Sequence, residues 1–405
     1  MESIKRDIEK DTDPNPIVDF NNSEIAFNNK SDKDLKQTFW LFKMMSKAKI
    51  VQLGSLAGLW AVKLHFPFVK TIIKKTIFNQ FCGGENLMDC QDAIDHLYKY
   101  NTLTILDYGA EGKSSEEELN SVSEELVRAI ELAAANESVP VVSVKLSALA
   151  DNELMAKVQK GDALTSGEER DFELLKTRID NICGRAADLG VGVFIDAEES
   201  WIQITIDNIV YDLMERYNKE KAIVYQTYQL YRHDKLEEIK RDHKTALENG
   251  YFLGAKLVRG AYMDKERERA QEKGYPSPIH EDKESTDNDF NLGIKYCVEN
   301  YETMASCCAS HNAYSNQYQA ELIAEMGLDR SHPHLNFSQL YGMSDFITFN
   351  LAEAGYNVGK YVPYGPIEEV IPYLIRRAQE NSSVTGEMGR ELEQVTKEMK
   401  RRGLD

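Results

Sequence analysis

The stretch VPVVSVKLSAL, residues 139–149, is a run of β-branched and other apolar residues that contains one charge, Lys145. An apolar run of this length is typical of a strand that is buried on both faces of a parallel sheet. A lysine inside such a strand needs a carboxylate partner, a ligand or a lowered pKa, because burial penalises its charged form. The stretch therefore predicts a buried strand that carries a polar site.

Similar stretches alternate with longer helical patterns from about residue 100 onward. The expected strands are 102–109, 139–149, 191–199, 222–228, 254–262, 303–312, 334–342 and 356–365. The expected helices include 116–136, 168–189, 200–217, 228–249, 286–301, 315–326 and a last one that contains YLIRRAQEN, residues 373–381. This alternation predicts βαβ units around a parallel sheet, and eight pairs predict a closed (β/α)8 barrel of the α/β class. The glycine-rich GxGxxG and GxxxxGK[ST] turns of open nucleotide-binding sheets do not occur at the places where those folds need them.

The predicted organisation has three parts. Residues 1–99 form a helical N-terminal arm, residues 100–385 form the barrel, and residues 386–405 form a charged C-terminal helix. The arm contains a long apolar stretch, residues 51–78, in which no uncharged run is long enough to cross a bilayer. Two interpretations of this stretch remain open, namely an apolar helix packed on the barrel and an interfacial helix that touches a membrane.

The composition limits the class of protein. The chain has 48 Lys and Arg against 67 Asp and Glu, a formal net charge of −19, which argues against non-specific binding to nucleic acid. Its six cysteines form no CxxC or Cys/His cluster with the spacing of a zinc site, so no metal centre is expected. Reduced thiols in a cytosolic compartment are expected, and the acidic N-terminal stretch is not expected to act as a signal or transit peptide.

The ends of the expected strands carry polar side chains, where a (β/α)8 barrel places its chemistry. In chain order they are Asp107, Lys145, Asp196, Gln226, Lys256 with Arg259, His311 with Asn312, Gln339 and Tyr361. The last helix follows the eighth strand directly, so the stripe with Arg376 and Arg377 is expected near the same mouth. Paired guanidinium groups bind planar carboxylates. The stripe is therefore either the solvated face of an amphipathic helix or a site for a small anionic substrate.

Six stretches in and around these strand ends form a composite pattern. They are KLSAL (145–149), IDAEE (195–199), KLVRGAYMDKER (256–267), SHN (310–312), QLYGM (339–343) and YVPYGPIEEVIPYLIRRAQENS (361–382). Together they resemble the proline dehydrogenases, flavoenzymes of amino-acid catabolism, over about residues 80–385. The pattern is most similar to the stand-alone branch that includes the mitochondrial enzymes. No stretch resembles the aldehyde-dehydrogenase module or the DNA-binding domain of bifunctional relatives.

This resemblance implies a distorted, TIM-like (β/α)8 barrel that holds FAD non-covalently at its mouth. Such an enzyme would oxidise L-proline to Δ1-pyrroline-5-carboxylate by hydride transfer to flavin N5 and pass the electrons to a membrane quinone. By matching position, the resemblance assigns the substrate pocket to Lys145, Asp196, Tyr361, Tyr373, Arg376 and Arg377. It assigns the flavin side to Gln226, Lys256, Val258, Gly260, Ala261, Tyr262, Thr286, His311, Asn312, Gln339, Leu340 and Glu380.

Several points stay open at this stage. Many bacterial relatives have arginine at the position of Lys256 and lysine at that of Arg259, which leaves open which of the two meets the flavin. The implied location is cytoplasmic, with or without peripheral contact at the inner face of the membrane, and neither the oligomeric state nor the base for the substrate amine is defined. The competing interpretations are a hydroxyproline dehydrogenase, a flavin-free lyase that uses Lys145 as a Schiff base, and a non-catalytic proline-binding or membrane-docking protein.

Overall fold

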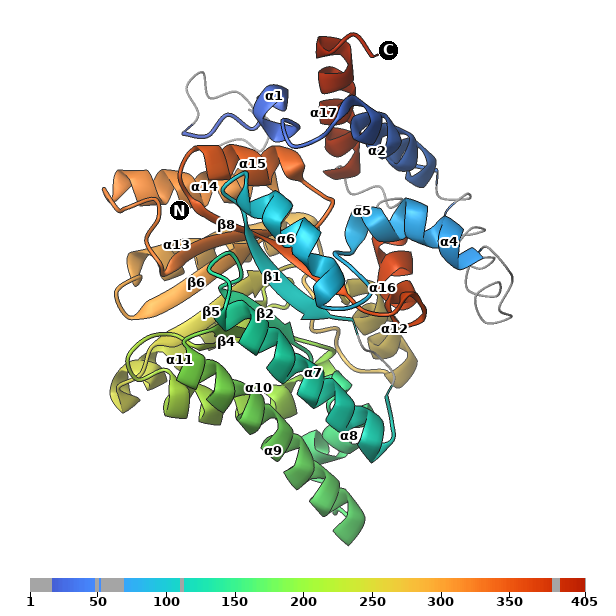
Figure 1. Cartoon of the computed structure of the whole chain (residues 1–405). Coiled ribbons are helices and arrows are strands. Elements are labelled where there is room, and N and C mark those ends of the chain that lie inside the picture. The colour runs from blue at the N-terminus through green and yellow to red at the C-terminus, as the bar shows by residue number, and fades with distance from the viewer. Residues whose placement is uncertain (1–16, 48–50, 52–68, 110–112, 381–386, 405) are drawn as a thin grey trace.

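The computed structural model has a closed barrel of eight parallel strands at its centre, joined in chain order (Figure 1). The described residues are 17–47, 51, 69–109, 113–380 and 387–404. The strands are β1 Leu103–Tyr108, β2 Val141–Val144, β3 Gly192–Ile195, β4 Val224–Gln229, β5 Leu253–Val258, β6 Met304–Ala309, β7 Leu335–Leu340 and β8 Asn357–Tyr364. Each of the eight predicted stretches overlaps one of these strands, and β8 closes the barrel by pairing with β1. The predicted (β/α)8 fold is confirmed.

Helices surround the barrel on its outer side (Figure 1). They are α7 Glu116–Ala134, α8 Asn152–Lys160, α9 Ser166–Leu189, α10 Ser200–Tyr217, α11 Lys235–Asn249, α12 Met263–Lys273, α13 Lys283–Glu299, α14 Ala313–Glu325, α15 Asp345–Glu353 and α16 Ile367–Glu380. The prediction of a helix from residue 228 is wrong at its start, because residues 228 and 229 belong to β4. Of the helices outside the predicted set, α12 is almost entirely charged and α15 is buried nearly all round, so neither shows an apolar stripe.

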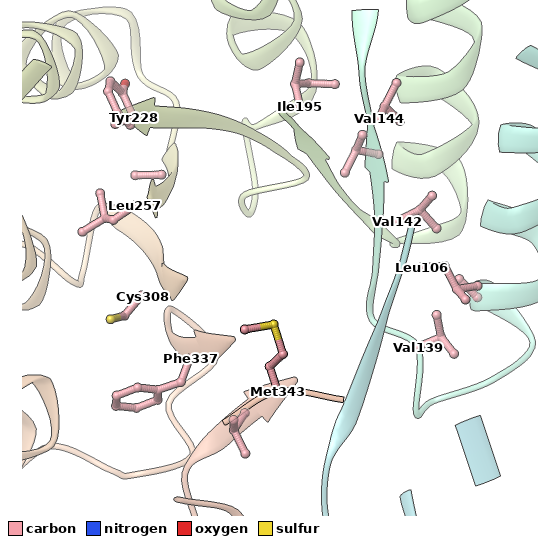
Figure 2. Close-up of a cluster of buried hydrophobic side chains, with 14 of the residues drawn as sticks. Leu106, Val139, Val142, Val144, Ile195, Tyr228, Leu257, Cys308, Phe337 and Met343 are labelled. Carbon is pink, nitrogen blue, oxygen red and sulfur yellow. The ribbon is translucent and has the colours of Figure 1, made fainter. Parts of the chain in front are cut away.

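Side-chain alternation along the strands separates an outer layer from an inner one. Figure 2 shows Val142, Ile195, Tyr228 and Leu257 with their side chains turned away from the barrel interior, where they join the main core beneath the helices. A separate buried cluster fills the barrel itself, and its members are Ile105, Phe194, Tyr225, Ala305, Cys307 and Tyr361. Because side chains alternate with a period of two, the residue two positions after each of these, toward the carboxyl end of the strand, also faces the barrel axis.

The N-terminal segment and the last helix lie outside the barrel. The N-terminal elements are α1 Ser23–Ala26, α2 Asp32–Met45, α4 Val69–Ile73, η1 Lys74–Phe78, α5 Asn79–Phe81, η2 Met88–Cys90 and α6 Gln91–Tyr98, and the last helix is α17 Glu387–Arg401. Helix α17 packs against α1 and α2 (Figure 1). Residues 52–68, most of the apolar stretch in the predicted arm, lie outside the described residues. None of the helices that the structure describes has the length and apolar character needed to cross a bilayer.

Candidate active site

A buried cluster of opposite charges lies at the carboxyl ends of the strands. Lys145 Nζ donates to Asp107 Oδ1 at 2.8 Å and lies 3.3 Å from Asp196 Oδ2. Lys256 Nζ donates to the other oxygen of Asp196, Oδ1, at 2.6 Å. Two carboxylates and two ammonium groups are thus paired at the mouth of the barrel. Four strands contribute one charge each. Asp107 and Lys256 lie just before the ends of β1 and β5, and Lys145 and Asp196 directly follow β2 and β3.

The position of Lys145 corrects one prediction. The strand predicted over 139–149 ends at Val144, and Lys145 immediately precedes a short 3-10 turn over Leu146–Ala148. Burial lowers the pKa of Lys145, but Asp107 and its other acidic neighbours outweigh that effect and raise the pKa well above its ordinary value. A charged lysine held by a carboxylate is the opposite of the neutral amine that a Schiff-base lyase needs. The geometry therefore argues against the flavin-free lyase interpretation.

Tyr361 of β8 completes the cluster. Its hydroxyl donates to Asp196 Oδ2 at 2.6 Å and accepts from Lys145 Nζ at 3.1 Å. The ammonium of Lys256 lies 4.8 Å from the centroid of the Tyr361 ring. Asp196 also accepts from Ser143 Oγ at 3.0 Å, so it is the common acceptor of the whole cluster. Burial alone would raise the pKa of Asp196, but the two lysines outweigh it and hold that pKa well below its usual range.

Lys256 and Arg259 point to different sides of the barrel wall. Lys256 is buried and faces the inner cluster, whereas Arg259 reaches outward to helices α13 and α14. Arg259 is bonded to Asp287, donates from Nη2 to Ser315 Oγ at 2.6 Å, and has its guanidinium carbon 3.7 Å from the centroid of the Phe290 ring. Of the two cations that the sequence left unresolved, Lys256 is therefore the one at the mouth.

Helix α16 presents its polar stripe toward the same region. Val370, Ile371 and Leu374 on one side of this helix are buried, while Arg376 and Arg377 are half-buried. The guanidinium of Arg377 lies 5.2 Å from the centroid of the Tyr373 ring. The side chain of Glu380, a predicted flavin-side residue on this helix, lies outside the described residues.

The arginine charges act on residues at two strand ends. Burial raises the pKa of Tyr262 well above its ordinary value, and the charges of Lys145 and Arg376 both oppose this shift. Burial is the largest cause that lowers the pKa of His311, and together with the charges of Lys360 and Arg377 it brings that pKa to about 3. Arg376 and Lys145 thus influence the same phenol after β5, and Arg377 influences the imidazole after β6. The two arginines of α16 therefore lie near residues that follow β5 and β6.

Three of the predicted flavin-side residues lie away from the charged cluster at the barrel mouth. Gln226 donates from Nε2 to Asp207 of α10 and so lies on the outer face of the barrel wall. Gln339 accepts from Thr348 Oγ1 of α15 at 2.8 Å and also lies in the helix-facing layer. Thr286 is buried in α13, where its hydroxyl donates to Asp282 O at 3.2 Å. The inner cluster contains none of these three side chains.

Gln229 is a candidate that the sequence pattern did not reveal. It occupies the last position of β4, four residues after the inward-facing Tyr225, and therefore shares the inner face. Its Nε2 donates to Glu198 O at 2.6 Å, while its buried Oε1 has no hydrogen-bond partner. A second unpredicted residue is Glu198 itself, a buried carboxyl that accepts from Ser147 N at 2.9 Å and whose pKa burial raises to about 7. Both residues border the cluster.

The remaining predicted flavin-side residues lie at the ends of strands or in the loops that follow them. Gly260 and Ala261 are exposed, and Val258, Tyr262, Leu340 and Asn312 are half-buried. Gly260 has a φ of +91°, which residues other than glycine rarely adopt. Asn312 caps α14 by accepting from Ser315 N at 3.0 Å. Exposed backbone groups after β5 can thus approach a ligand closely.

These features fit a bound flavin. The unpartnered Oε1 of Gln229 offers an acceptor, Lys256 offers a cation at the strand ends, and the loop at Gly260 and Ala261 offers accessible backbone groups. Flavins are bound by such combinations of hydrogen-bonding groups and nearby charge. Within the described part of the chain, His, Cys, Asp and Glu residues form no group of three or more that could hold a metal ion.

The chain is similar in sequence to several known proteins. The family model described as proline dehydrogenase matches residues 90–390. Proline dehydrogenase 1, mitochondrial, of Dictyostelium discoideum is 30% identical over 97% of this chain and 78% of that protein. Proline dehydrogenase 1, mitochondrial, of Drosophila melanogaster is 40% identical over a stretch that covers 58% of this chain and 36% of that protein.

Among solved structures, proline utilization A (PutA) from Bdellovibrio bacteriovorus, inactivated by N-propargylglycine, has a similar fold. The TM-score is 0.70 at 23% sequence identity, and the match covers 90% of this chain and 38% of that chain. This chain thus spans little more than a third of the Drosophila protein and of the PutA chain that it matches. The structural match agrees with the closed barrel.

Proposed function

Since the chain belongs to the proline dehydrogenase family, we propose that it uses FAD to oxidise L-proline to Δ1-pyrroline-5-carboxylate and passes the electrons to a membrane quinone. The observation that carries the proposal is the buried cluster around Asp196, which joins Lys145, Lys256 and Tyr361 beneath the arginine stripe of α16. The two cations and the phenol of this cluster converge from different strands on one place at the mouth. Such convergence of charged groups in a buried site is a mark of catalytic function.

Arg376, Arg377 and Lys145 bind the carboxylate of the substrate in this proposal. Guanidinium groups hold carboxylates through two parallel hydrogen bonds, and a nearby ammonium adds a third contact. Their influence on Tyr262 and His311 supports a common location for these charges at the mouth. Anchoring the carboxylate fixes the proline ring, so that C5 presents its hydrogen in one direction.

FAD supplies the hydride acceptor, the N5 atom of its isoalloxazine ring. Lys256 is the residue that would stabilise negative charge developing on the cofactor, and Gln229 would accept one of its hydrogen bonds. Val258, Gly260, Ala261 and Tyr262 form the adjoining loop. Asp196 holds both Lys256 and the hydroxyl of Tyr361, so it keeps a cation and an aromatic wall of the pocket in fixed relative positions.

The quinone acceptor requires contact with a membrane surface, which suits a cytoplasmic enzyme that binds the inner face of the membrane peripherally. Helix α2 offers one such surface among the described residues. Trp40 and Met44 are 58% and 48% exposed on it, and Lys43 Nζ lies 4.9 Å from the centroid of the Trp40 ring. Exposed apolar side chains beside lysines are typical of helices that lie at a lipid interface.

We expect the purified protein to carry FAD and to lose the absorbance of oxidised flavin when L-proline is added without oxygen. The reason is that hydride transfer from proline reduces the bound flavin, and without an acceptor the flavin stays reduced. An absorbance spectrum before and after anaerobic addition is the measurement, with addition of buffer alone as the control. A protein that is colourless and takes up no added FAD contradicts the proposal. A protein that binds proline without bleaching is a binder rather than a dehydrogenase.

We expect kcat/KM for L-proline to exceed that for trans-4-hydroxy-L-proline, and Tyr361→Ser to narrow the difference. Tyr361 is 8% exposed, and its hydroxyl is already bonded to Asp196 and Lys145. A hydroxyl on the substrate edge would therefore be crowded and would lose solvation. Tyr361→Phe keeps the ring and serves as the matched control, which should keep the preference. Equal use of both substrates by the natural protein contradicts this role and favours the hydroxyproline dehydrogenase alternative. Full preference for L-proline in Tyr361→Ser also contradicts it and favours a purely packing role for Tyr361.

A further inference from the structure

The residue before helix α15 has an unfavourable backbone conformation. Ser344 has φ 51° and ψ 41°, in the left-handed region, and among the described non-glycine residues only Asn101 shares a positive φ. This conformation costs a serine on the order of 1 kcal/mol. Surrounding contacts must therefore hold Ser344 in place.

Both the backbone and the side chain of Ser344 are used to make contacts beyond its own helix. Its backbone N–H donates to Glu391 Oε2 of helix α17 at 2.7 Å. Its hydroxyl does not cap α15 but is bonded to His311 Nδ1 at 2.8 Å. Ser344 thus connects the C-terminal helix to the imidazole that follows β6.

The first turn of α15 reaches a second strand end as well. Thr348 Oγ1 donates to Ser344 O at 3.2 Å and to Gln339 Oε1 of β7 at 2.8 Å. Gln339 Nε2 in turn donates to Ser310 O, the residue next to His311, at 3.2 Å. The orientation of this turn therefore determines the surroundings of His311 from two sides.

Glu391 is buried in a cluster of charges on the outer side of β8. Asp345 of α15 forms ion pairs with Lys360 at 2.9 Å and with Lys30 at 3.2 Å. Burial and the charge of Asp345 raise the pKa of Glu391 to about 7, although Lys360, the Ser344 N–H and Lys30 oppose the shift. Burial of the Glu391 carboxyl is unfavourable, and the group that it binds is the backbone N–H of the strained residue Ser344.

We propose that Glu391 is a positioning residue for the cofactor: by holding Ser344 in its left-handed conformation, it orients the ring of His311 toward FAD. The inference rests on the proposed binding of FAD at the barrel mouth. The imidazole is neutral, because its pKa is lowered to about 3, so it carries one proton. The hydrogen bond at Nδ1 then decides whether Nε2 acts as a donor or an acceptor toward the cofactor.

Three variants of the full-length chain test this role through the dissociation constant of FAD. Ser344→Gly removes the hydroxyl, but glycine adopts a φ of 51° without strain, so the fold is retained. Glu391→Ala removes the acceptor of the Ser344 N–H, whereas Glu391→Gln retains an acceptor oxygen. Glu398→Gln is the matched control, because Glu398 is a buried carboxyl of the same helix that pairs with Arg401 instead.

Quenching of FAD fluorescence, titrated with protein stripped of its flavin, gives the dissociation constant, and thermal unfolding is recorded beside it. We expect Ser344→Gly and Glu391→Ala to weaken FAD binding about tenfold, and Glu391→Gln and the control to stay within about threefold of the natural protein. If both single variants, Ser344→Gly and Glu391→Ala, bind FAD with the dissociation constant of the natural protein, the inference is overturned. Absence of FAD binding by the natural protein overturns the proposed function itself, so the two failures are distinguishable.

Discussion

Arg376→Met is expected to raise the KM for L-proline about 100-fold while FAD remains bound. Methionine keeps a long, flexible side chain on the amphipathic helix α16 but removes the proposed charge-assisted contact to the substrate carboxylate. A hydrogen bond to a charged group contributes about 1.5–3 kcal/mol, and the upper part of this range corresponds to about a hundredfold in binding. Arg377→Met should behave similarly, and Lys145→Ala should weaken proline binding in the same direction. Steady-state kinetics with an artificial electron acceptor measure the effect.

The matched control for this prediction is Arg185→Met. Arg185 lies on helix α9, where its exposed guanidinium donates to Glu131 Oε1 of α7 at 2.8 Å. Its replacement should leave KM and kcat within about twofold, since exposed ion pairs contribute little. Unchanged proline kinetics in both Arg376→Met and Arg377→Met would make the stripe of α16 an ordinary solvated helix face.

Asp196→Ala is expected to lower kcat/KM for L-proline by at least about 100-fold and to destabilise the protein by about 3 kcal/mol. Removing one partner of a buried ion pair leaves the other charge uncompensated, which costs about 3–5 kcal/mol. Here the loss affects Lys256, Lys145 and the hydroxyl of Tyr361 at the same time. Urea unfolding gives the stability, and the same acceptor assay gives the activity.

The stability change should depend on pH in a defined direction. Lys256 and Lys145 overcome the effect of burial and hold the pKa of Asp196 below its unfolded value of about 3.9. A carboxyl with a lowered pKa stabilises the fold above its unfolded pKa, and this contribution disappears as the pH falls through the lower folded value. The advantage of the natural protein over Asp196→Asn should therefore be full at pH 7 and shrink below about pH 4. A difference that stays constant from pH 7 to pH 3 contradicts the ionised pairing.

The barrel could be predicted because short stretches, most of them apolar or β-branched, alternate with longer helical patterns eight times along the chain. The sequence could not show which side chains of a strand point into the barrel and which point toward the helices. The strand VYQTYQ, residues 224–229, is buried on both faces, so no polar alternation distinguishes the outward Gln226 from the inward Gln229. Lys256 and Arg259 were left open because relatives exchange lysine and arginine at these positions, and the structure shows that the two side chains face opposite sides.

The partners within the site were beyond the reach of sequence patterns for another reason. Lys145 and Tyr361 meet because β8 pairs with β1, a contact between segments far apart in the chain, and the register of that pairing fixes which side chains share a level. Local propensity carries no information on such register. The link from Glu391 to His311 likewise depends on how α17 is placed against α15, which the apolar stripe of α17 leaves undetermined.

Closure of the barrel by its last strand has a consequence for the order of events at the ribosome. The chain emerges from its N-terminal end, so Asp107 and Lys145 are synthesised well before Tyr361, and β1 has no edge partner in β8 until late in translation. A nascent chain that lacks β8 and α16 has neither the phenol nor the two arginines of the pocket. Under the proposed function, the substrate pocket is therefore completed late in the synthesis of each molecule, and prematurely terminated chains lack the two guanidinium groups proposed to bind the proline carboxylate.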